Sequence, residues 1–436
     1  MKSTKENEKY QDWYYKALER TGGRAAFLHF LFNPEKDTRV DMHMHSTITR
    51  GVRTSPEILS ESAKRNMDII SITDNDTFKA YYSATNKDIQ SSGYSKALLW
   101  GSEITTFVDM IDTTTKQPYK KRVEVLVYFS DPRKMEQYVI DGKFPYLVRE
   151  YKIIRNIKSL EHKLQIINDL HITTKPITID DIIGVTAKNS DGSEILDDDK
   201  KTLTIPLASM GLSARELLGD LTNNIAAIKP GDLDKPVIFN GTAYELNFDY
   251  FNDKLFDYLK QDKQAVRYFL KNGVNLNEIH RREFNKSILS KPPFADEKIW
   301  EGYPDIEEVV KFARDCGGVA ILAHPAKYNL SLPEIEYLML NAYHAGIDGY
   351  EVMHGFTDLE SCRYVYSICE RLGAIPTLGS DLQKRHDEQG TPTAVGQGNR
   401  ITSKPIRLSV KNMHKFLGRD SLEKRPIGTE NARNFE

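Results

Sequence analysis

Short apolar segments recur along the chain, and each ends in a cluster of polar residues. The segments are rich in Val and Ile, and this composition between polar clusters is typical of buried strands. The pattern predicts seven strands, at Arg39–Met44, Met67–Ile72, Ala97–Trp100, Val123–Phe129, Gly318–Leu322, Gly346–Met353 and Ala374–Leu378.

Helical patterns separate most of these strands. Ser55–Arg65 opens with a capping residue followed by proline, and Asp305–Asp315 has apolar residues at helical spacing. Pro333–Ala345 and Leu359–Leu372 have similar patterns. Strands that alternate with helices and end in polar residues predict a parallel α/β barrel with its chemistry at one rim.

Residues 131–300 have a different pattern. Arg149–Leu170 predicts a long amphipathic helix, and Asp180–Ile183, Ala214–Leu221 and Tyr250–Asn272 predict further helices. The chain therefore divides into an N-terminal helical extension (1–38), a first barrel part (39–130), a mainly helical insertion near the barrel mouth (131–300), a second barrel part (301–415) and a flexible tail (416–436).

Composition narrows the class of protein. The chain has 436 residues and a net charge of −2, so no global field favours nucleic acid or an acidic membrane. Its three cysteines form no CxxC pair, which suits a reducing compartment. The sequence shows no signal-peptide pattern and no apolar run long enough for a membrane span. We expect a cytoplasmic protein with no membrane partner, and no feature indicates an oligomeric state.

The polar residues at the predicted strand ends are candidates for metal binding. Strand alternation would place His43 and His45 on one face, with Asp41 behind them. A lone His-x-His pair is more often a surface or core pair than a metal site, so the other strand ends decide the interpretation. A barrel would gather at one rim the side chains of His43, His45, Glu103, Glu124, His324 and Asp381. Imidazole and carboxylate groups together form a typical ligand set for transition metals.

The motifs around these residues resemble the polymerase and histidinol phosphatase (PHP) family in order and spacing. In chain order they are D-M-H-M-H-S, S-P-E, S-I-T-D-N-D-T, G-S-E-I-T, A-I-L-A-H-P, G-I-D-G-Y-E-V and L-G-S-D. The resemblance covers about residues 39–129 and 303–396. It implies a distorted (β/α)7 barrel with a long, mainly helical insertion, up to three divalent metals, and hydrolysis of phosphoesters of small nucleotides or short oligonucleotides.

The resemblance also implies two metal subsites. One metal would be held by His43, His45, Glu103 and Asp381, and a second would share Glu103 and add His324. Glu124 stands where the family usually has histidine, and a carboxylate remains a competent ligand. We expect two divalent ions, of manganese, zinc or iron.

The third metal site of the family is altered at three positions. Arg50, Asn75 and Gln383 replace residues that would bind this metal. We hypothesise that Arg50 substitutes for the cation and takes part in catalysis, and that Asn75 and Gln383 donate hydrogen bonds to a substrate phosphate. The alternative for Arg50 is a solvated loop arginine. His354 either protonates the leaving oxygen or is a strand-end histidine bonded to backbone.

Substrate selection is assigned to the insertion. Arg149, Arg155 and Arg282 are candidates for binding a second phosphate or a nucleic-acid backbone, although most charged helix residues are only solvated. The predicted function is a metal-dependent phosphoesterase acting on a small phosphorylated substrate such as a nucleotide. The alternatives are a degenerate PHP module that binds a partner without cleavage, and a nuclease on longer DNA or RNA, which the near-neutral charge disfavours.

Overall fold

The chain forms two compact units, one of residues 1–138 with 304–436 and one of residues 139–303. The computed structural model describes residues 2–49, 51–83, 90–111, 116–186, 204–206, 213–226, 237–239, 242–244, 248–289, 293–294, 301–328, 330–355, 357–382, 394–401 and 404–418. Arg50, Gln383 and residues 419–436 of the predicted tail lie outside the described residues.

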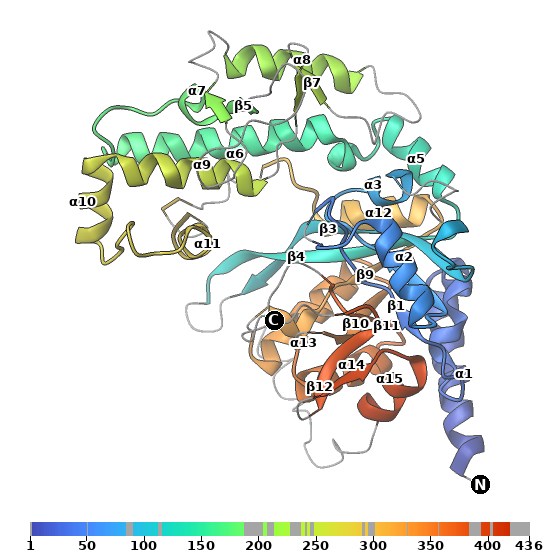
Figure 1. Ribbon diagram of the computed structural model, residues 1–436. Helices are drawn as coiled ribbons and strands as arrows, with labels where there is room; N and C mark the ends of the chain where they lie inside the picture. Colours follow the sequence, from blue (N-terminus) through green and yellow to red (C-terminus); the bar gives the residue numbers. More distant parts are fainter. Residues whose placement is uncertain are drawn as a thin grey trace. The chain divides into compact units, whose positions relative to one another are not determined.

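The first unit is built on a seven-stranded sheet in the order β1-β2-β3-β4-β9-β10-β11 (Figure 1). The strands are β1 Val40–Asp41, β2 Ile69–Ile72, β3 Ala97–Ile111, β4 Pro118–Phe129, β9 Val319–Leu322, β10 Gly349–His354 and β11 Ile375–Gly379. The two edges meet, because Met42 N donates to Leu378 O at 3.1 Å and His45 N donates to Leu382 O at 2.8 Å. The sheet is therefore a nearly closed barrel, and the predicted fold class is confirmed.

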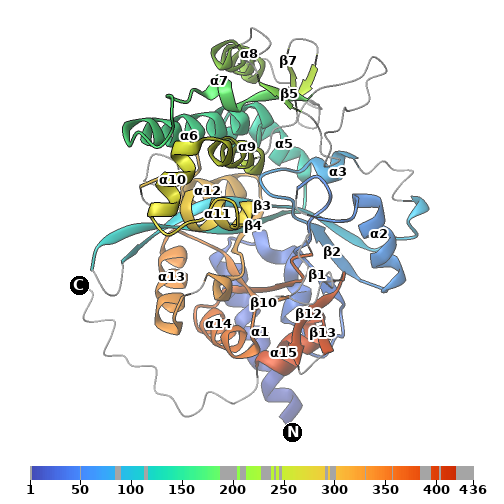
Figure 2. The ribbon, with the colours of Figure 1, turned by 60° about the vertical axis from the view of Figure 1, so that its left-hand side comes forward.

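Strand β4 runs against the direction of the other strands. It pairs antiparallel with both β3 and β9, whereas the remaining neighbours in the sheet are parallel. Strand β3 continues to Ile111, far past the predicted end at Trp100, and forms a long hairpin with β4 (Figure 2). The expectation of a strand-end position is therefore wrong for Glu124, which lies inside β4, opposite Thr105. A hairpin needs no helical crossover, which explains the reversal.

Capped helices cover the barrel. They are α2 Ser55–Lys64, α12 Ile306–Asp315, α13 Leu332–His344 and α14 Leu359–Arg371, each within one residue of its predicted bounds. Helices α2, α12 and α13 each begin with a capping box. The capping box of α2 is formed by Thr54 and Glu57, so the N-cap is Thr54 and not the predicted Ser55. Helix α12 packs on β3, β4 and β9, and α14 packs on β10 and β11.

The N-terminal extension belongs to the barrel unit. It comprises α1 Lys2–Arg20 and the 3-10 helix Arg24–Phe32. Trp13 Nε1 donates to Ala374 O at 2.5 Å, beside β11. His414, on α15 (Val410–Leu417), lies between the Tyr366 hydroxyl at 2.6 Å and Leu31 O at 2.8 Å. These contacts attach both ends of the described chain to the barrel. The remaining short elements of this unit are α3 Lys79–Ser83, α5 Pro132–Ile140, which extends into the second unit, and the hairpin β12 Gln397–Ile401 with β13 Lys404–Arg407.

The second unit has its own hydrophobic core, which includes Ile157, Leu164 and Phe269. Its elements are α6 Arg149–Asp169, α7 Ile179–Ile182, α8 Ala214–Ala226, α9 Phe248–Gln261, α10 Lys263–Lys271, α11 Arg281–Phe284, and two hairpins, β5 Gly184–Thr186 with β6 Thr204–Pro206 and β7 Val237–Phe239 with β8 Thr242–Tyr244. The prediction of helix over Tyr250–Asn272 is confirmed, but the segment forms two helices and not one. Asp262 ends α9 and caps α10, accepting from Gln264 N at 2.8 Å and Ala265 N at 2.9 Å. The place of this unit near the barrel mouth stays a prediction.

Within the described parts of the chain, no helix combines the length and the apolar character that crossing a bilayer requires.

Candidate metal centre

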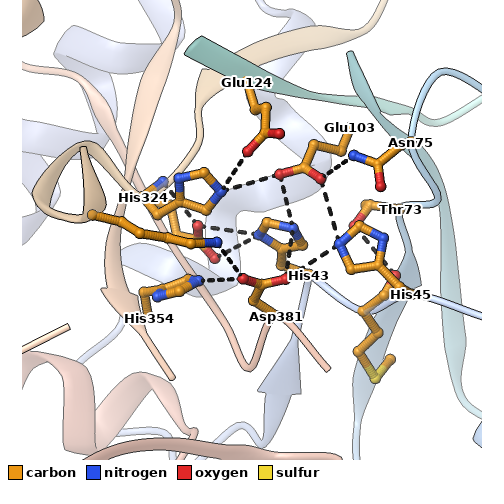
Figure 3. A network of polar contacts seen from close by, with 12 residues as sticks. His43, His45, Thr73, Asn75, Glu103, Glu124, His324, His354 and Asp381 are labelled. Carbon is orange, nitrogen blue, oxygen red and sulfur yellow. Dashed lines mark hydrogen bonds and ion pairs between the residues drawn. The ribbon is translucent and has the colours of Figure 1, made fainter. Parts of the chain in front are cut away.

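Side chains from five barrel strands and their ends converge in one buried cluster (Figure 3). His43 and His45 follow β1, and His324 and Asp381 follow β9 and β11, while the two glutamates stand within β3 and β4. Five of the side chains are almost fully buried, and Glu124 is 13% exposed. The structure therefore brings together all six residues predicted as metal ligands: His43, His45, Glu103, Glu124, His324 and Asp381.

Two adjoining groups of ligand atoms make up the cluster. In the first, His43 Nε2 lies 3.2 Å from Glu103 Oε1, and His45 Nε2 lies 3.2 Å from Asp381 Oδ1 and 3.4 Å from Glu103 Oε2. In the second, His324 Nε2 lies 3.1 Å from Glu103 Oε1 and 3.2 Å from Glu124 Oε2. Glu103 is common to both groups, as a carboxylate that bridges two cations would be.

The donor atoms of the cluster fit divalent ions. The Nε2 atoms of His43 and His45 are buried and make no hydrogen bond. Buried polar atoms are nearly always satisfied, so two unsatisfied nitrogens beside carboxylates indicate a partner that accepts lone pairs. Imidazole nitrogen with carboxylate oxygen suits manganese, iron or zinc.

Mutual electrostatics keep the cluster charged. Burial alone would raise the pKa of the Glu103 carboxyl. The neighbouring His43 and His324 lower this pKa by a larger amount, so it lies well below its usual range. Burial lowers the pKa of His43, but Glu351 and Glu103 raise it to well above the usual value. The acids are therefore ionised at neutral pH, and positive charge stabilises them, either on protonated histidine or on a bound cation.

Glu351 on β10 contacts His43 and His324 through its carboxylate. Its carboxylate oxygens lie 3.1 and 3.2 Å from His43 Nδ1, and one of them accepts from His324 N at 3.0 Å. A carboxylate at Nδ1 holds the imidazole with Nε2 directed at the metal position. Glu351 was not among the residues predicted from the sequence, although it is one of two acidic residues, with Asp348, inside the apolar segment Gly346–Met353.

His354, also on β10, contacts the cluster through Asp381. Its Nε2 lies 3.0 Å from Asp381 Oδ2, so this nitrogen has a carboxylate partner. Burial lowers the pKa of His354 to about 4, only partly offset by Glu351 and Asp381. The ring is therefore neutral near pH 7 and donates to Asp381. Proton transfer from His354 to a leaving oxygen stays a prediction.

A bulge in β10 brings His354 into the cluster. Strand alternation would direct residues three apart to opposite faces. The pairing of β10 with β11 shifts register between Glu351 and Met353, which places an extra residue in β10. Glu351 and His354 consequently both reach the cluster.

Lys327 is a second residue that the sequence analysis missed. It ends the 3-10 turn Pro325–Lys327 directly after His324, and its Nζ lies 2.6 Å from Asp381 Oδ2. Lys327 and His354 lower the pKa of Asp381 to well below its usual range, although burial raises it. The signal was a basic residue two positions beyond the His-Pro pair at a strand end.

Two candidate ligands have unusual backbone conformations. His324 has φ 29° and Asp381 has φ 49°, a region that residues other than glycine seldom adopt. Such conformations concentrate at functional sites because surrounding contacts must hold them. Gly379 allows the close packing here, since an added Cβ would lie against His43 and 2.7 Å from Glu351 Oε1.

Asn75 and Asp41 lie beside the cluster and make hydrogen bonds within the protein. Asn75, predicted to bind phosphate, donates from Nδ2 to Glu103 Oε2 at 2.5 Å. The carboxylate of Asp41 accepts from three backbone N–H groups, those of Ser380 at 2.9 Å, Gly396 at 2.7 Å and His43 at 3.4 Å. Burial raises the pKa of Asp41 to about 6. Asp41 thus ties β1 to the segment that carries Asp381.

The arginines predicted to bind substrate lie in the second unit. Arg155 is only 5% exposed, and its guanidinium lies 3.7 Å from the centre of the Tyr303 ring. Arg149 begins α6 and is half-buried. The backbone of Arg282 lies in α11, but its side chain is not among the described ones. A substrate contact for any of the three stays a prediction, as does one for Arg50 and Gln383.

Comparison with known proteins adds to this geometry. No family model matches the chain. A curated 3',5'-nucleoside bisphosphate phosphatase from Chromobacterium violaceum is 32% identical over 103 residues, which make up 23% of this chain and 35% of that protein. The chain therefore matches about a third of the length of that curated relative. The resemblance stated from the motifs is confirmed.

Two solved structures are similar to this chain at low sequence identity. One, from Bifidobacterium adolescentis, is described provisionally as a metal-dependent phosphoesterase; it is 17% identical with a TM-score of 0.42, and the match covers 87% of this chain and 94% of that one. The other is an amidohydrolase from Chromobacterium violaceum with bound sulfate and no metal; it is 17% identical with a TM-score of 0.41, over 82% and 92% of the chains. Similarity at this level assigns no residue role.

Proposed function

We propose that the chain is a metal-dependent phosphoesterase that hydrolyses phosphate esters of small nucleotides or short oligonucleotides. The observation that supports this most is the pair of adjoining ligand groups that share Glu103. When bound, two divalent ions would activate water and neutralise the charge that develops on the phosphoryl oxygens.

The side chains divide the work around these ions. His43, His45, Glu103 and Asp381 would hold one ion, and Glu103, Glu124 and His324 would hold the other. Glu351 keeps His43 in the tautomer that presents Nε2, and His354 holds Asp381 in place. Asn75 fixes the second oxygen of Glu103. Most of the ligands are thus oriented before a substrate arrives.

The choice of substrate rests on the family resemblance and on the curated relative. That relative is named for nucleoside 3',5'-bisphosphates, which makes these compounds the first to assay. A nuclease on longer DNA or RNA is less favoured, because the net charge of −2 gives little attraction to a polyanion. A degenerate binding module is disfavoured by the presence of all six candidate ligands in one cluster.

The test is a substrate panel with the full chain. Nucleoside 3',5'-bisphosphates, short oligonucleotides and long single strands would be incubated with Mn, Zn, Fe or Mg ions, with metal content measured on the same preparation. We expect phosphate release from the small esters and about two ions per chain. A chain that binds metal but cleaves nothing in the panel would favour the binding module, and cleavage confined to long strands would favour the nuclease.

A further inference from the structure

The two oxygens of Asp381 have different partners. Oδ1 faces the ring nitrogens of His43 and His45, at 3.8 and 3.2 Å. Oδ2 accepts from Lys327 Nζ at 2.6 Å and from His354 Nε2 at 3.0 Å. Only Oδ1 therefore points into the group that would hold a metal, and two donors already occupy Oδ2.

Lys327 contributes a positive charge to a centre that is rich in carboxylates. Five buried or nearly buried carboxylates contact the histidines, those of Asp74, Glu103, Glu124, Glu351 and Asp381. Two divalent ions would balance four of these charges, and the ammonium of Lys327 would balance the fifth. Arg122 lies 3.7 Å from Glu124, and its side chain is 39% exposed. Lys327 is thus the less exposed of the two basic residues, at 19%, and it bonds directly to a candidate ligand.

The ammonium of Lys327 has more N–H donors than its bond to Asp381 uses. Lysine Nζ carries three N–H donors, and Asp381 takes one of them among the described residues. Phosphate oxygens are good acceptors for a compact point charge of this kind. The turn that carries Lys327 follows His324 directly, so its backbone is anchored to the same cluster.

We propose that Lys327 is a fixed cation of the centre: its ammonium reserves Oδ2 of Asp381, so that this carboxylate offers a metal only Oδ1, and its remaining N–H groups bind a phosphoryl oxygen. The phosphoryl contact rests on the proposed function, whereas the effect on Asp381 does not. Lys327 is a positioning residue toward the metal and a binding residue toward the substrate.

The test is calorimetry on Lys327→Met and Lys327→Arg. Metal-free chain would be titrated with Mn²⁺, and manganese-loaded chain with inorganic phosphate. For Lys327→Met we expect Mn²⁺ to bind about tenfold more tightly, because a repelling charge beside a ligand is lost. We expect phosphate to bind about tenfold more weakly, because a charged donor is lost. Lys327→Arg should keep both affinities within a few-fold of the parent chain.

The opposite signs separate this role from structural damage. A fall in both affinities for Lys327→Met, or no change in either, would overturn the proposal. Lys327→Gln is the second neutral variant should the methionine one misfold. The matched control is Lys311→Met, which removes an exposed lysine paired with Asp315 on α12. A parent chain that binds manganese but hydrolyses no phosphoester would refute the proposed function, and the manganese arm would still decide the role of Lys327.

Discussion

The two units of the molecule bury different kinds of charge. The barrel unit gathers acids and imidazoles that lie within about hydrogen-bonding distance of each other, so that each holds its neighbours in the charged form. The described buried polar residues of the second unit include the cations Arg155 and Lys163 and no carboxylate. Lys163 Nζ donates to Asn252 Oδ1 at 2.8 Å, and burial lowers the pKa of Lys163 to about 8. In the barrel unit, the buried carboxylates stay ionised and could bind a cation. In the second unit, burial beside a helical core makes the ammonium of Lys163 easier to deprotonate.

The largest expected effect is the loss of a metal ligand in the barrel. His43→Ala or Asp381→Ala should lower hydrolysis by about 10³-fold or more, because the ion that activates water is lost. The fold should remain. Turnover, metal content and thermal unfolding measure this. Activity near the parent level in both variants would remove the centre from consideration.

A smaller effect is expected from the carboxylate behind the ligands. Glu351→Gln should weaken Mn²⁺ binding by about 10- to 100-fold, because His43 loses the charge that fixes its tautomer. Calorimetric titration of metal-free chain measures this. Glu57→Gln is the matched control, since glutamine also completes the capping box of α2. Equal manganese affinities in the two variants would contradict the support assigned to Glu351.

The second subsite should tolerate exchange of one ligand type for another. Glu124→Ala should lower turnover by about 10- to 100-fold through loss of the second ion, in the range found for weakened metal sites. Glu124→His should stay within about tenfold of the parent, because imidazole is an equivalent ligand. Metal content per chain distinguishes the variants. Two ions retained by the alanine variant would show that Glu124 is not a ligand.

The smallest effect belongs to the second unit and concerns stability alone. The folded-state pKa of Lys163 is about 8 against 10.5 when exposed, so the unfolded chain binds more protons between these values. Stability of this unit should therefore rise by up to about 3 kcal/mol as the pH increases from 8 to 10.5. Lys163→Met should remove that rise and leave hydrolysis unchanged. Denaturant unfolding across this pH range tests the slope, and identical slopes in both chains would count against a buried, weakened charge.

Much of the barrel could be predicted from local patterns. Helix bounds followed from caps and apolar spacing, as in Asp305–Asp315, because both act within a few residues. The direction of β4 could not be predicted, since an apolar strand has the same pattern whichever way it runs. The break at Asp262 was missed because the helical spacing continues on both sides of it.

The sequence by itself determined the chemical types at the strand ends, and therefore the expectation of imidazole and carboxylate ligands around divalent ions. A barrel brings strand ends together whatever their separation along the chain, so their meeting followed from the fold class. Only the tertiary structure decided which oxygen of each carboxylate faces which partner. Glu351 and His354 enter through a register shift, and Lys327 through a turn after a strained residue. Such positions depend on long-range strand pairing and on backbone angles, which no local pattern of residue types encodes.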